Sequence, residues 1–132
     1  MIAALSAWHR QHEPAAQALT HVTALPAHAV VEAYAVLTRL PSGLAVPAVT
    51  AAAVLARRFA GPPLMLAARQ RATLPERLAD AGVLGGATYD GLVALEAAAH
   101  DQTLLTLDTR ARSTYGRLGI AFELIDGSPL PL

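Results

Sequence analysis

Hydrophobic positions in this chain form two patterns, short and mostly apolar runs and longer stretches with helical spacing, and the two patterns alternate. The short runs have the length of buried strands and cover residues 22–26, 64–67, 103–107 and 120–125. The longer stretches predict helices over residues 13–20, 27–40, 47–59, 69–81, 109–117 and within 85–100. Short strands that alternate with helices indicate an α/β fold with a mainly parallel sheet.

Proline and glycine support several of these boundaries. Pro14 suits the first turn of a helix, where a missing N–H costs nothing. The helix over residues 27–40 is expected to end at Pro41-Ser42-Gly43. Met1 to Leu5 is apolar and compatible with a helix, whereas residues 126–132 are expected to be irregular.

The composition indicates one globular domain over residues 1–132. With 54% hydrophobic and 15% charged residues, intrinsic disorder is not the expected state. The absence of cysteine excludes disulfides and thiolate zinc sites, and it is consistent with a cytoplasmic protein. Ten basic and ten acidic residues cancel, so there is no strong overall field to attract nucleic acid. The apolar runs are too short for a transmembrane helix, and no signal peptide is expected.

Two acids stand at the ends of neighbouring predicted elements. Asp90 lies in the first turn of the helix that follows Gly85-Gly86, and Asp108 lies at the carboxyl end of the strand that follows that helix. Helix starts and strand carboxyl ends share one edge of a parallel sheet, where ligands bind, so the two acids are expected to meet. Each also has a purely structural interpretation, Asp90 through the helix dipole and Asp108 as a helix N-cap.

Glu32 is the most unusual residue of the helix over residues 27–40. Its neighbours on the helix face and along the chain are mostly apolar. A carboxylate in apolar surroundings costs several kcal/mol unless it is paired or bound to a metal. The structural alternative is a surface glutamate, or one that is hydrogen-bonded to Tyr34 or His28.

Taken together, Glu32, Asp90 and Asp108 indicate a site for a hard divalent cation. Carboxylate oxygens suit Mg²⁺ or Mn²⁺, which bind a few carboxylates, water and substrate phosphate. Such a metal can generate hydroxide and stabilise the leaving oxygen of a phosphodiester.

Three segments resemble the PIN-domain ribonucleases, specifically the VapC toxins of bacterial toxin–antitoxin pairs. They are residues 26–41, with the sequence PAHAVVEAYAVLTRLP, residues 85–90, GGATYD, and residues 103–108, TLLTLD. The resemblance implies a PIN-like three-layer sandwich, with a central mainly parallel sheet flanked by helices. It also implies an endoribonuclease that uses Mg²⁺ or Mn²⁺, with Glu32, Asp90 and Asp108 as catalytic metal-site acids. A VapB-like antitoxin and a homodimer are the expected partners besides RNA.

The chain departs from the family pattern at its start, where the family has a short strand that ends in Asp. Met1 to Leu5 resembles only the helix that follows this strand, so the first strand is expected to be absent. Two explanations are possible for the missing strand. The true start lies upstream of Met1, which we favour because the rest of the site is intact, or the chain is a shortened, inactive relative that only binds an antitoxin or another partner chain. An open reading frame upstream that encodes a strand ending in Asp would favour the enzyme.

The remaining polar residues are weaker candidates. Arg110, Arg112 and Arg117 follow Asp108 and are expected either to contact RNA phosphate or to form a solvated helix face. Glu96 lies on a different helix face from Asp90 and is therefore expected to lie outside the site.

Overall fold

The computed structural model describes residues 1, 5 and 9–125, and its contacts divide the chain into two compact units. Within the described residues, the first unit holds residues 1–25, 29–63 and 125, and the second unit holds residues 26–28 and 64–124. Each unit has its own hydrophobic core. The tail after residue 125, Trp8 and most of the Met1–Leu5 segment lie outside the described residues.

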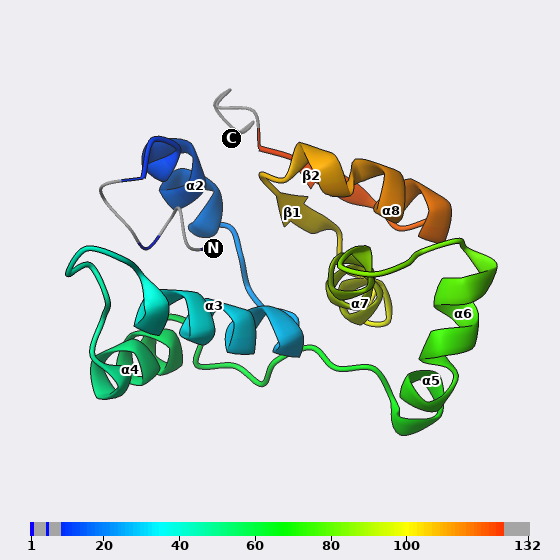
Figure 1. Cartoon of the computed structure of the whole chain (residues 1–132), viewed down its shortest axis with the longest axis horizontal. Coiled ribbons are helices and arrows are strands. Elements are labelled where there is room, and N and C mark those ends of the chain that lie inside the picture. The colour runs from blue at the N-terminus through cyan, green and yellow to red at the C-terminus, as the bar shows by residue number, and fades with distance from the viewer. Residues whose placement is uncertain (2–4, 6–8, 126–132) are drawn as a thin grey trace. The chain divides into compact units, whose positions relative to one another are not determined.

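The first unit is helical. It contains α2 (His12–Leu19), α4 (Ala48–Arg58) and all but the first two residues of α3 (Ala27–Arg39). Figure 1 shows α3 and α4 side by side, and their contact consists of Ala33 and Leu37 packed with Ala51 and Leu55. Alanine at this contact lets the two backbones approach closely, which explains why so alanine-rich a sequence forms a core here.

The second unit combines helices with a parallel strand pair. Its elements are α5 (Ala68–Ala72), α6 (Leu74–Asp80), α7 (Ala87–Ala98), β1 (Leu104–Thr106), η1 (Thr109–Ala111), α8 (Arg112–Leu118) and β2 (Phe122–Leu124). Strands β1 and β2 pair in parallel, with Leu104 opposite Phe122 (Figure 1). Helices α7 and α8 pack together on a core that includes Leu95, Tyr115 and Leu118. The prediction of helices combined with parallel strands is therefore confirmed.

The strands predicted over residues 22–26 and 64–67 were wrong in extent. The structure reduces them to one parallel bridge between Pro26 and Leu64, where the N–H of Ala27 donates to the Leu64 carbonyl at 2.8 Å. Proline has no N–H to donate to a neighbouring strand. Pro26, Pro62 and Pro63 all lie at or next to this bridge, which explains why the pairing does not extend. Among the described residues, the only named strands are therefore β1 and β2.

The helix predicted over residues 69–81 is broken into α5 and α6 at Thr73. Pro75 explains the break, because it lacks the N–H that would continue the helical ladder and its ring crowds the preceding turn. Across the part of the chain that the structure describes, no helix has both the length and the apolar character needed to cross a membrane.

Candidate functional site

Asp90 occupies the first turn of α7 in the second unit, as the sequence predicted. The chain enters this helix through Gly85, whose φ of 56° lies in the left-handed region that glycine adopts without strain. Gly91, the next residue, packs so closely that an added Cβ would meet the side chain of Leu78 at 3.0 Å. The close packing of Gly91 fixes the backbone at the start of α7, where the partly exposed Asp90 lies.

Asp108 follows β1 and caps the short helix η1. Its Oδ1 accepts a hydrogen bond from the backbone N–H of Arg110 at 2.8 Å and lies 3.4 Å from the Arg110 Nε. Burial raises the pKa of the Asp108 carboxyl, but the hydrogen bonds and the charge of Arg110 outweigh it and bring this pKa below its usual value. The structural interpretation of Asp108 as a cap is confirmed, and the carboxylate is ionised at neutral pH.

Glu32 belongs to the first unit, on the exposed side of α3. Of the two interpretations, the surface glutamate is the one that the structure shows, and the apolar neighbours Val31 and Tyr34 are exposed as well. Glu32 also lies within electrostatic range of the Met1 amine. Burial lowers the pKa of that amine, and the negative charge of Glu32 acts in the opposite direction.

The structure places Asp90 and Asp108 in the same compact unit and Glu32 in the other. Within residues 1, 5 and 9–125, no three His, Asp or Glu side chains are grouped as a metal site. The assignment of the three acids to one metal site stays a prediction.

Glu96, which the sequence placed outside the site, is fully buried and connects α7 with α5 and with residues 26–28, all in the second unit. Its Oε2 accepts from the backbone N–H of His28 at 3.0 Å, in the first turn of α3. Its Oε1 accepts from Arg71 Nη2 at 3.2 Å. Because Glu96 stands alone in the apolar run from Leu92 to Ala99, the argument applied to Glu32 would have found it.

Two aromatic rings stack beside Asp90. The rings of His28 and Tyr89 lie with their centroids 5.3 Å apart and their planes within 6° of parallel. Tyr89 directly precedes Asp90 in α7, and 58% of it is exposed.

The arginines that follow Asp108 differ in their contacts. Arg110 pairs with Asp108, and Arg117 donates from Nη1 to the Gly82 carbonyl at 2.9 Å. Arg117 thus ties α8 to the segment that follows α6. The predicted contact of Arg110, Arg112 and Arg117 with RNA phosphate stays a prediction.

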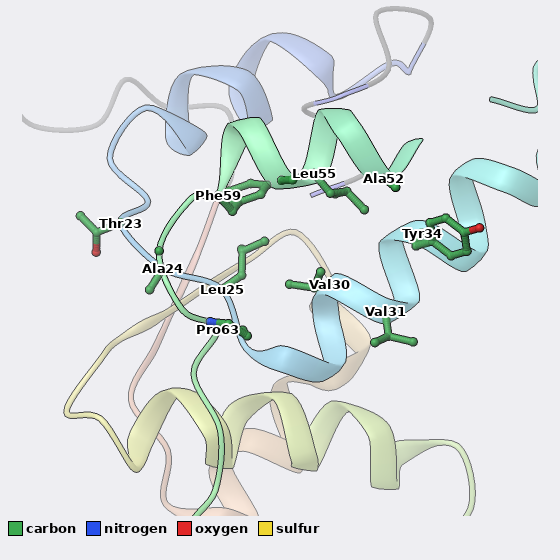
Figure 2. A pocket seen from close by; sticks show the side chains of 12 residues that line it. Thr23, Ala24, Leu25, Val30, Val31, Tyr34, Ala52, Leu55, Phe59 and Pro63 are labelled. Atoms are coloured by element: carbon green, nitrogen blue, oxygen red, sulfur yellow. The ribbon is translucent and has the colours of Figure 1, made fainter. Parts of the chain in front are cut away.

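The first unit carries an apolar pocket of about 370 Å³ between α3 and α4. Figure 2 shows Leu55 of α4 and Phe59, the residue after that helix, on one side, and Leu25 with Val30 of α3 on the other. Almost all of the lining is aliphatic or aromatic, and Val31 at its edge is 65% exposed. This chemistry suits an apolar peptide segment better than a charged ligand.

The family model of the PIN domain matches residues 1–117. The chain is 43% identical to Ribonuclease VapC40 of Mycobacterium tuberculosis over 125 residues, which cover 95% of this chain and 93% of that protein. It is 44% identical to Ribonuclease VapC27 of the same species over 118 residues, which cover 89% and 79% respectively. No solved structure matches significantly.

Proposed function

This chain belongs to the PIN-domain family, and on that premise we propose that it is a VapC-type endoribonuclease toxin, which hydrolyses RNA phosphodiester bonds. The observation that carries the proposal is the identity of more than 40% to two ribonucleases over about nine-tenths of the chain. The family match extends over Glu32, Asp90 and Asp108, the three acids that the sequence singled out.

Glu32, Asp90 and Asp108 would hold Mg²⁺ or Mn²⁺. The donor set fits such an ion, because hard cations prefer carboxylate oxygens. Asp108 is ionised at neutral pH, and its cap to Arg110 leaves acceptor capacity on the carboxylate. When bound, the metal supplies an activated water and neutralises charge on the phosphate. The protein's part is to orient the carboxylates, which for Asp90 rests on the close packing around Gly91.

The two compact units are proposed to form one PIN-like domain, a three-layer sandwich with a mainly parallel sheet. The parallel pairing of β1 with β2 and the parallel bridge between Pro26 and Leu64 support it, since both have the strand direction that such a sheet requires.

A VapB-like antitoxin is the proposed partner that holds the toxin inactive, with a homodimer as the assembled form. The pocket between α3 and α4 supports an apolar antitoxin segment as its occupant, because its walls offer Leu25, Leu55 and Phe59 and almost no polar group. Burial of an apolar side chain there would make the free energy of binding more favourable, by roughly 25 cal/mol for each Å² of apolar surface removed from water.

Cleavage of RNA tests the proposed activity. The unmodified chain is expected to cleave RNA with Mg²⁺ or Mn²⁺ and to lose the activity in EDTA. Asp90→Asn should lower the rate on the order of 100-fold, as loss of a charge-stabilising group does elsewhere. Asp80→Asn, at an exposed position at the end of α6, is the matched control and should cleave normally.

Equal activity of the unmodified chain and Asp90→Asn would exclude Asp90 from the site. No cleavage by the unmodified chain would favour the alternative, a PIN-domain protein that binds a partner without catalysis.

A further inference from the structure

The stacked rings of His28 and Tyr89 leave aromatic surface open to solvent. Their planes are nearly parallel, and the centroid separation of 5.3 Å exceeds the contact distance of about 3.5 Å between ring planes, so the rings are offset. An offset pair covers only part of each ring. Tyr89 is accordingly 58% exposed although it is a large aromatic residue in a regular helix.

The position of this ring pair is fixed by buried contacts. The backbone N–H of His28 donates to Glu96, whose carboxylate is completely buried and also bound by Arg71. The residue before His28 is tied to Leu64 by a backbone hydrogen bond of 2.8 Å. Tyr89 and Glu96 belong to the same helix, α7, so the buried carboxylate holds the backbone of His28 against the helix that carries Tyr89.

Asp90 follows Tyr89 directly, so the exposed ring and a proposed metal ligand leave the same turn of α7. An RNA strand whose phosphate reaches Asp90 must place its adjoining bases near this turn. A flat, rigid, partly exposed aromatic surface is the feature that unpaired bases stack on in proteins that bind single-stranded RNA.

We propose that the His28–Tyr89 pair is a stacking platform for one unpaired nucleobase next to the phosphate that the protein cleaves. The inference rests on the proposed ribonuclease function and adds the subsite that holds the base. Stacking uses the face of the base and not its edges, so the platform fixes the position of the RNA strand without selecting one base strongly.

Binding in metal-free buffer with EDTA tests the platform separately from cleavage. The probe is a short, unstructured, single-stranded RNA with a 5′-fluorescein label, followed by fluorescence anisotropy. Tyr89→Ala and His28→Ala should each weaken binding at least about fivefold, the lower end of measured stacking contributions. Tyr89→Phe keeps the ring and should bind like the unmodified chain. Tyr34→Ala, which removes another exposed tyrosine, is the matched control and should also bind normally.

A second measurement separates stacking from a structural role of the pair. A nucleotide without a base is substituted at each position of the RNA in turn. With the unmodified chain, one position should show a loss of affinity, and Tyr89→Ala should remove that loss, because the base and the ring act as a coupled pair. A variant that is only partly unfolded would weaken every RNA equally and keep the position-specific loss.

The outcomes distinguish the two proposals. If the unmodified chain cleaves this RNA with Mn²⁺ but Tyr89→Ala binds it equally well, or keeps the same positional loss, the platform is wrong and the ribonuclease function stands. If the unmodified chain neither binds nor cleaves RNA, both proposals fail.

Discussion

At the scale of single residues, the Glu96 carboxylate is stable without water because both of its oxygens are hydrogen-bonded. One oxygen receives the N–H of His28 and the other receives Arg71, whose side chain is 50% exposed. The first N–H groups of a helix lack partners within the helix and carry partial positive charge, which favours a carboxylate there. Pro26 and Ala27 have no polar side chain to cap α3, so Glu96 supplies the cap from another helix.

Glu96→Ala is expected to destabilise the protein by about 2–4 kcal/mol, because it leaves the His28 N–H without its acceptor and opens a cavity. Chemical denaturation measures the loss. Glu76→Ala, at an exposed position in the first turn of α6, is the control and should cost less than about 1 kcal/mol. An equal loss of stability in the two variants would show that the buried contacts of Glu96 contribute no more than those of an exposed glutamate.

Asp108 should titrate below 3.8, the ordinary value for its carboxyl, in metal-free buffer. A pKa lowered on folding contributes stability above the unfolded value, and this stability is lost as the pH falls through the folded value. The contribution is under about 1 kcal/mol, since the side chain is 40% exposed and solvent screens its contact with Arg110. NMR titration of the Asp108 side-chain carbon gives the midpoint. A midpoint above 3.8 would mean that burial outweighs the cap.

Sequence distance decides which of these contacts could be foreseen. The Asp108 cap joins residues two positions apart, so its elements were visible in the local sequence. Glu96 bonds partners 25 and 68 positions away, and no local pattern identifies Arg71 or His28 as its partners. The apolar run around Glu96 showed only that the carboxylate would need partners.

At the scale of elements, α7 packs most closely against α6 and α8 at Gly91. A Cβ added at Gly91 would meet side-chain atoms of Leu78 at 3.0 Å and Leu118 at 3.2 Å. Glycine inside a helix normally costs about 1 kcal/mol relative to alanine. Here the missing side chain lets α6 and α8 pack against the turn that follows Asp90.

Gly91→Val should therefore lower the melting temperature, with an overpacking cost of about 1–3 kcal/mol. Gly116 provides the matched control within α8, because nothing lies within 4 Å of an added Cβ. Gly116→Ala should leave the melting temperature unchanged or raise it, by up to about 1 kcal/mol in stability. A Gly91→Val protein that is as stable as the parent would contradict the packing described for α7.

Helices were predictable from the sequence because periodicity and proline positions act locally, as at Pro14 in α2. Strands were less predictable from the sequence. The run over residues 103–107 does contain β1, but residues 22–26 form only a bridge. An apolar run indicates that a segment is buried, but strand pairing also needs backbone N–H donors along the segment. The prolines at the bridge between Pro26 and Leu64 remove such donors.

At the scale of the whole molecule, the three acids are divided between two compact units, with Glu32 in one and both aspartates in the other. Their positions in the sequence and the family pattern both singled out these residues, and their shared metal site stays a prediction. The sequence could not predict how far each is exposed, because exposure depends on packing between distant segments. Binding of a metal by Glu32, Asp90 and Asp108, as proposed, would stabilise the folded protein by linkage.

Mn²⁺ should raise the melting temperature of the unmodified chain, by about 2.7 kcal/mol in stability at a hundredfold excess over the dissociation constant. Glu32→Gln and Asp90→Asn should each remove most of this increase, although they lie in different units. Glu13→Gln, an exposed position of α2 in the same unit as Glu32, is the control and should retain it. A full increase in Glu32→Gln would exclude Glu32 from the metal site.

The bond between Glu96 and the N–H of His28 has one further consequence, for amide hydrogen exchange. The first amides of a helix exchange readily with solvent, because no carbonyl of the helix accepts from them. The His28 amide instead donates to a carboxylate that solvent does not reach. Its exchange therefore requires His28 to separate from Glu96 of α7, and a single amide signal reports the opening of this contact within the second unit.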